Sequence, residues 1–368
     1  MSGASIHTWR DLLLPNEQNT HVVLPEVTEG HNTAKTSSFS LPAWDPERLP
    51  PSAHLFENLP SRMHEHLRVI IDQHFSDQAA RTSFTNRRGR SVTPNDVIEG
   101  LRDRCDFGGT FNLSYEGRTA AITESLACLV KVVYSALTGN FLDVQPQERS
   151  SNGAVITDHV FQFDDGIKIL WADKSSRAFD RFIGELMEQM RDRSAVELCN
   201  ESVATSYRGY KAILGKVRVC LSDITYLSHV YLQLAYHAGD TQPRVRWAII
   251  FSGLHYMIVY IPRTPGRPQM FCSPVLQFCL RLDDEQEPSI RPPIWSTLAY
   301  MLLVETLNID DDDLRQSLDV PKGDPDLGSK TDARGCRRSA RTTEIDETWS
   351  HSAVKVQTLF FLFFRAWC

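Results

Sequence analysis

Residues 155–174, VITDHVFQFDDGIKILWADK, decide the fold class. Apolar and polar residues alternate from Val155 to Phe163, as a half-buried strand requires, and the chain returns through the apolar run Ile167–Trp171. Asp164-Asp165-Gly166 between the two runs is a hairpin-turn signal. We therefore predict an antiparallel strand pair whose second strand ends in Trp171-Ala172-Asp173-Lys174.

Helical periodicity surrounds this strand pair. A second strand pair is predicted at Arg246–Phe251 and His255–Ile261, because both runs are aromatic and β-branched. The order of elements indicates an α/β or α+β protein with a central mixed sheet flanked by helices. Apolar spacing or helix-start signals predict helices over 59–75, 93–104, 118–137, 177–193, 203–214, 223–237 and within 289–307.

The segments outside this core are poor in apolar periodicity. We expect a disordered leader over residues 1–55, one α/β domain over 56–307 and a charged disordered linker over 308–347. An apolar C-terminal element, a late strand or buried helix, follows at 348–368, and its abrupt end leaves open that a further C-terminal domain is missing. Residues 145–153 are expected to form turns.

Composition narrows the class of protein. The 368-residue chain is 42% hydrophobic and 23% charged, as globular domains are, and its net charge of −7 argues against a broad nucleic-acid-binding surface. The basic cluster Asn86–Arg90 could contact phosphates, although such clusters are more often solvated loops. Eight cysteines lack zinc-ligand spacing and no signal peptide or membrane-spanning run is found, which indicates an intracellular protein, cytoplasmic or nuclear, without a membrane partner.

Two carboxylates at strand ends form the candidate site. Asp158 lies near the start of the first strand, and Asp173 with Lys174 lies at the end of its partner. Carboxylate oxygens a few ångströms apart bind hard divalent ions, and a lysine beside them can orient a water or steady a phosphate. This pattern predicts Mg²⁺ or Mn²⁺ at Asp158 and Asp173 and cleavage of a nucleic-acid phosphodiester.

The segment 157–176, TDHVFQFDDGIKILWADKSS, resembles the core of the PD-(D/E)XK nuclease-like superfamily, the restriction-endonuclease fold. That family's order is a helix, a strand bearing an aspartate, a strand ending in acid-x-lysine, a helix and a further strand. The resemblance implies supporting roles for Glu124 and Gln233 from helices. Residues 169–176 and 233–262 are also similar to fungal families of which some members are fused to fungal-type kinase domains.

One position departs from the motif. Ala172 stands where the resemblance implies a metal-binding acid, and neighbouring strand residues point to opposite faces, so Asp173 and Lys174 cannot both face one site without a bulge. Three readings follow: an active metal-dependent nuclease, a degenerate nuclease-like fold, or a non-catalytic module that binds a kinase-like protein partner. Asp158 and Asp173 could equally be ordinary strand-end charges.

Other catalytic signatures are missing from the sequence. It contains no P-loop, no G-x-S-x-G nucleophile motif and no kinase His-Arg-Asp loop. His159, His237 and His255 have no partner at ligand spacing and are expected to be surface or packing residues.

Overall fold

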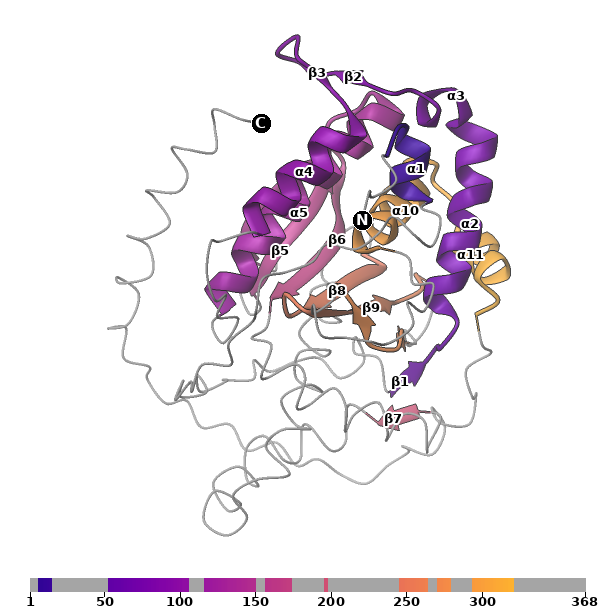
Figure 1. Ribbon diagram of the computed structural model, residues 1–368. Coiled ribbons are helices and arrows are strands. Elements are labelled where there is room, and N and C mark those ends of the chain that lie inside the picture. Colours follow the sequence, from indigo (N-terminus) through magenta and orange to yellow (C-terminus); the bar gives the residue numbers. More distant parts are fainter. Residues whose placement is uncertain are drawn as a thin grey trace, which may run out of the picture. The chain divides into compact units, whose positions relative to one another are not determined.

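The computed structural model describes residues 6–14, 52–105, 116–149, 156–173, 195–197, 245–263, 270–278 and 293–320 (Figure 1). These residues all belong to the first of two units, 1–323 and 324–368. The helices and strands within them are, in chain order, α1 (Trp9–Leu13), β1 (Ser52–Leu55), α2 (Leu59–His74), α3 (Ser76–Ala79), β2 (Phe84–Thr85), β3 (Ser91–Val92), α4 (Pro94–Cys105), α5 (Glu116–Thr138), β4 (Asp143–Arg149), β5 (Ile156–Phe163), β6 (Gly166–Asp173), β7 (Ala195–Glu197), β8 (Trp247–Phe251), β9 (His255–Tyr260), β10 (Met270–Cys272), β11 (Leu276–Gln277), α10 (Ile294–Thr306) and α11 (Asp311–Leu318).

A mixed sheet forms the centre of the described chain. Its strands run in the order β4-β5-β6-β8-β9-β10-β1-β7, and β11 pairs with β9. Most neighbours are antiparallel, but β6 pairs with β8 in parallel, as does β1 with β10. The α/β class and the mixed sheet flanked by helices are thereby confirmed. Since parallel neighbours need a crossover connection, the segment 174–246 must carry the chain from the end of β6 back to the start of β8.

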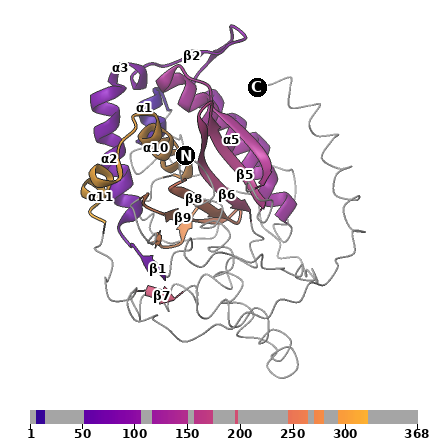
Figure 2. The same cartoon turned by 180° about the vertical axis from the view of Figure 1, so that it is seen from behind.

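Helices cover one face of this sheet. Helix α5 lies along β5 and β6, as the two opposite views in Figures 1 and 2 show. The alternate residues Phe161, Ile169, Trp171, Trp247 and Ile249 share a single hydrophobic core with residues of α1, α2, α5, α10 and α11. Helix α10 contacts α5, α2 and β6 and is buried on every side over Ile294–Glu305. The sheet face under α5 and α10 is therefore core.

Helix α5 contradicts one expectation drawn from the sequence. Its window Thr119–Thr138 is long and apolar enough to cross a membrane by length and composition, although no such run was expected. Within the protein 61% of that window is buried, and core helices pass the same test. Packing against the sheet accounts for the apolar character of this helix.

The helices and strand pairs predicted inside the described residues are confirmed, apart from their end positions. The hairpin turn at Asp164-Asp165-Gly166 is also confirmed, and Gly166 there has a φ of 125°, which favours glycine. The helices predicted over 177–193, 203–214 and 223–237 lie outside the described residues, as do the linker beyond residue 320 and the C-terminal element.

The prediction of a disordered leader is wrong for its two described pieces. Thr8 caps α1 in a capping box with Asp11, and Trp9 is completely buried. From α10, Trp295 Nε1 donates to the Leu12 carbonyl at 2.9 Å and Ser296 Oγ to the Leu13 carbonyl at 2.7 Å. A five-residue helix is too short to leave a periodic signal, so its packing could not be predicted.

The linker and the turn-rich segment need similar corrections. The acidic run at 310–313 is the start of α11, where Asp310 caps the helix and the following aspartates face its positive end. Strand β4 replaces the turns expected over residues 145–149, and the rest of that predicted turn segment lies outside the described residues. It pairs with β5 alone among the strands of the path, and Pro146 is tolerated because β4 is an edge strand.

Candidate functional site

Asp173 ends β6 on the sheet face that α5 covers. The register of β6 against β8 runs without a shift from Ile169 to Asp173, so side chains alternate regularly to the end of the strand. Trp171 and Asp173 therefore share one face, and His159, paired with Trp171 across the hairpin, lies on that face too. Ala172 lies on the opposite face. The one register shift between β5 and β6 is at Phe161/Gln162, away from this end of the pair.

The Asp173 carboxylate is held by buried donors. Oδ1 accepts from Thr123 Oγ1 of α5 at 2.6 Å and from Trp171 Nε1 at 2.9 Å. Oδ2 lies 2.9 Å from His159 Nε2. Oδ2 has no aligned hydrogen-bond donor within the described segments, and its contact with His159 becomes an ion pair when the imidazole is protonated. The side chains of His159 and Asp173 are only 6% and 2% exposed. We call Thr123, His159, Trp171 and Asp173 the Asp173 cluster.

His159 carries the electrostatic signature of this cluster. Burial alone lowers its pKa, but the contact with Asp173 and the charge of Asp173 outweigh burial and raise the pKa above its ordinary value. The charges of Asp158 and Glu124 act in the same direction. Three carboxylates, from α5, β5 and β6, thus favour a positively charged imidazole at this position.

Asp158 is engaged at the strand end rather than beside the Asp173 carboxylate. Its Oδ2 accepts a hydrogen bond from the backbone N–H of Asp173 at 2.8 Å. Asp158 directly precedes His159, and neighbouring strand residues point to opposite faces of a sheet. The Cβ atom of Asp158 therefore lies on the face opposite the Asp173 cluster. The half-buried carboxylate turns back along the strands and satisfies a backbone donor. Asp158 therefore fixes the end of β6.

These contacts do not fit the predicted metal centre. A divalent ion needs carboxylate oxygens free to coordinate it. Asp173 instead presents its two oxygens to Thr123, Trp171 and His159. Among the described residues, no group of three or more His, Cys, Asp or Glu side chains is arranged to hold an ion. At the position where the resemblance implies a metal-binding acid, the chain supplies only the methyl group of Ala172.

The remaining predicted site residues divide in two. Glu124 is half-buried on α5 and its charge acts on His159, which places it close to the Asp173 cluster. Lys174 and Gln233 lie outside the residues that the structure describes. The roles predicted for Lys174 and Gln233 stay predictions.

Sequence reasoning missed Thr123, Trp171 and His159 as partners of Asp173. His159 was expected to be a surface or packing residue, and the structure places it in the buried packing against Asp173. The alternation of Trp171 and Asp173 on β6 was available from the sequence. Thr123 could not be found in the same way, because its place depends on how α5 docks on the sheet.

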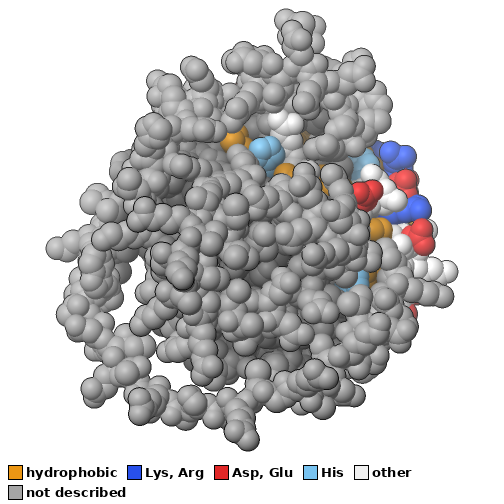
Figure 3. Space-filling view, turned by 90° about the horizontal axis from the view of Figure 1, so that it is seen from below, with side chains coloured by type: hydrophobic (Ala, Val, Ile, Leu, Met, Phe, Trp, Pro, Cys, Tyr) orange, Lys and Arg blue, Asp and Glu red, His pale blue; other side chains and the backbone are white. Residues whose placement is uncertain are grey.

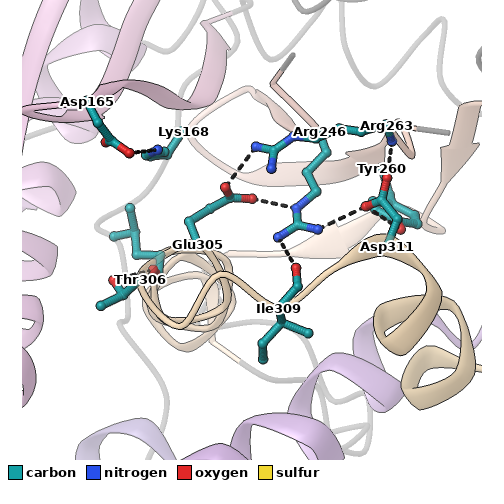
Figure 4. Close-up of polar contacts among 10 residues, drawn as sticks. Asp165, Lys168, Arg246, Tyr260, Arg263, Glu305, Thr306, Ile309 and Asp311 are labelled. Atoms are coloured by element: carbon teal, nitrogen blue, oxygen red, sulfur yellow. Dashed lines mark hydrogen bonds and ion pairs between the residues drawn. The ribbon is translucent and has the colours of Figure 1, made fainter. Parts of the chain in front are cut away.

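A second buried polar group lies between the sheet and the helices α10 and α11 (Figure 4). Arg246, 1% exposed, donates from Nε to Glu305 at 2.5 Å, from Nη1 to Asp311 at 2.9 Å and from Nη2 to the Ile309 carbonyl at 2.8 Å. Arg263 reaches the other Glu305 oxygen at 2.8 Å. We call Arg246, Arg263, Glu305 and Asp311 the Arg246 cluster. The positive charges of its two arginines balance the negative charges of its two carboxylates, and both carboxylates are hydrogen-bonded within it. Its geometry suits a structural tie rather than a ligand site.

Comparison of the chain with protein-family models, with curated proteins and with solved structures found no match.

Proposed function

We propose that this chain is a nuclease-like α/β domain that no longer hydrolyses phosphodiester bonds and that acts by binding a protein partner. One observation carries the loss of hydrolysis. Asp173, the carboxylate predicted to bind the metal, is held inside the core by Thr123, Trp171 and His159, while Ala172 occupies the motif's acid position on the other face. A metal ion at Asp173 would have to displace His159 from Oδ2 or compete with Thr123 and Trp171 at Oδ1.

The element order supports the nuclease-like part of the proposal. Helix α5 is followed by β4, by β5 with Asp158 and by β6, which ends at Asp173; β8 follows as a further strand. Apart from the additional strand β4, this order is the one that the resemblance implies. The parallel pairing of β6 and β8 requires a crossover between them, which is where the resemblance implies the second helix.

Metal-dependent hydrolysis is the second candidate, and a specific observation favours it. Glu124, Asp158 and Asp173 all act on His159, so three carboxylates gather at one end of the β5–β6 pair. An active centre would need Asp173 to turn away from the core side of the sheet. If active, the domain would use Mg²⁺ or Mn²⁺ and a nucleic-acid substrate.

Calorimetry with Mg²⁺ and Mn²⁺ separates the two candidates. The full chain, Asp158→Ala and Asp164→Asn are titrated with each ion and incubated with single- and double-stranded DNA and RNA. Asp164 is an exposed turn residue and serves as the matched acidic control. We expect no saturable heat up to about 1 mM ion, the weak end of protein sites for divalent cations, and no cleavage by any variant. Saturable binding and cleavage that Asp158→Ala abolishes and Asp164→Asn retains would overturn the proposal.

The partner part of the proposal rests on the resemblance to proteins fused to fungal-type kinase domains. To test it, the full chain is titrated with a purified kinase domain of that type, and the heat of binding is measured by calorimetry. We expect a saturable 1:1 complex. A chain that neither cleaves nucleic acid nor binds such a domain would leave the loss of hydrolysis standing and refute the partner.

A further inference from the structure

A basic hairpin lies between α3 and α4. We call residues 84–92 the arginine hairpin; β2 and β3 form its arms and Asn86–Arg90 its tip, which Figure 1 shows projecting from the helices. Asn86 organises the tip: its backbone N–H donates to the Arg90 carbonyl at 2.9 Å, and its side-chain Oδ1 accepts from the N–H groups of Arg88 and Arg90, each at 3.0 Å. Gly89 supplies the positive φ of 73° that the turn needs. These bonds order the backbone of the tip, from which the arginine side chains extend.

The hairpin concentrates positive charge in an acidic protein. Arg87, Arg88 and Arg90 are all exposed, and no Asp or Glu occurs between residues 78 and 95. The chain as a whole carries a net charge of −7. On the face in Figure 3, by contrast, acidic and basic side chains of the described part lie interspersed. A single-sign basic tip on such a protein attracts polyanions locally.

An exposed aromatic ring lies beside the tip. Phe141, which follows α5, is 51% exposed, and the Arg87 guanidinium stands 4.9 Å from its ring centroid. Phe141 and Val69 are the large hydrophobic side chains that are exposed in the described ranges, and Phe141 is the more exposed of the two. We call this pair of side chains, whose arginine belongs to the same tip as Arg88 and Arg90, the Arg87–Phe141 platform.

This combination favours one class of ligand. Unpaired bases stack on aromatic rings and on arginine planes, while arginines bind the phosphates on either side. A duplex keeps its bases stacked inside and offers only phosphates. An acidic peptide satisfies the arginines but has no use for the ring face. We propose that the arginine hairpin and Phe141 form a binding site for single-stranded nucleic acid, with phosphates on Arg88 and Arg90 and a base on the Arg87–Phe141 platform.

The site goes beyond the proposed loss of hydrolysis. It uses no residue of the Asp173 cluster and needs no metal ion. Binding here and cleavage elsewhere are therefore measured separately, and either can fail alone.

Fluorescence anisotropy tests the proposal with a labelled 20-nucleotide oligo(U) RNA, the same length of RNA duplex and a polyglutamate peptide. The variants are the triple Arg87→Gln/Arg88→Gln/Arg90→Gln, Phe141→Leu, Phe141→Tyr and, as a control, Arg68→Gln at an exposed position of α2. Circular dichroism confirms that each variant is folded.

We expect oligo(U) to bind more tightly than the duplex or the peptide. The triple variant should lose at least tenfold in affinity, and Phe141→Leu at least about fivefold, the lower end of base-stacking contributions. Phe141→Tyr, which keeps a ring, and Arg68→Gln should bind as the wild type does. Two phosphate contacts, at Arg88 and Arg90, predict a slope of log affinity against log salt of about −1.4. No binding of oligo(U) at low salt, an unchanged triple variant, or tighter binding of the duplex or the peptide would refute the site.

Discussion

Removing the Asp173 carboxylate should unfold this protein more readily, because the group is a structural partner in the core. In Asp173→Ala, Thr123 Oγ1 and Trp171 Nε1 lose their common acceptor, and the charge on His159 is left buried without its counterion. Breaking a buried ion pair by removing one partner typically costs about 3–5 kcal/mol of unfolding free energy. Asp173→Asn should cost less, since its amide oxygen still accepts from Thr123 and Trp171 while the charge is lost.

Urea unfolding followed by circular dichroism at pH 6 measures this cost, with His159 charged in the folded state. Asp164→Asn, at the exposed hairpin turn, controls for the loss of an acidic residue and should change stability by no more than about 0.5 kcal/mol. We expect the free energy of unfolding to decrease from the wild type to Asp173→Asn and further to Asp173→Ala. If Asp173 were instead one of several metal-ligand carboxylates that repel one another, its removal would relieve that repulsion. Asp173→Ala would then be at least as stable as the wild type. That result would refute a structural role for Asp173.

Three further outcomes follow from buried contacts. The pKa of His159 is raised in the folded protein, so its contribution to stability is complete below its unfolded-state pKa of about 6.5. This contribution is lost as the pH rises through the folded-state pKa. A pH series of urea melts should show the loss in the wild type and not in His159→Gln. Arg246→Met leaves Glu305 and Asp311 without their main partner and should cost about 3–5 kcal/mol by the same urea assay. Trp9→Ala should cost about 3–5 kcal/mol in thermal unfolding, whereas an unpacked leader would give no change.

Local patterns were enough to predict the sheet-forming strands. The period-two alternation of β5, the Asp-Gly turn and the aromatic runs of β8 and β9 each act through neighbouring residues, so the sequence predicts them directly. Strand β4 escaped prediction because its polar composition and Pro146 resemble a turn. Only its pairing with β5 at the sheet edge makes it a strand.

Long-range packing decides what the sequence could not. Helix α1 is held by contacts with α10, nearly 300 positions further along the chain, and no local signal records them. The acidic residues of α11 were predicted to belong to a disordered linker, because Arg246, the buried partner of Asp311, lies on a distant segment.

The candidate site shows the same division between local and distant information. Alternation on β6 predicts that Ala172 and Asp173 face opposite sides, which the register with β8 confirms. Which side would be core depends on where α5 packs. That helix brings Thr123 to Asp173 and turns an expected metal ligand into a buried hydrogen-bond acceptor.

The most direct test of the central claim is a titration with Mn²⁺ observed by NMR on the Trp171 indole N–H, which donates to Asp173 Oδ1. Mn²⁺ is paramagnetic and broadens signals near its binding site, and Trp171→Phe assigns the resonance. We predict that the indole signal keeps its intensity, relative to the other tryptophans, at substoichiometric Mn²⁺. Selective, saturable broadening of the Trp171 signal that Asp173→Asn removes would contradict the account and place a metal ion at Asp173.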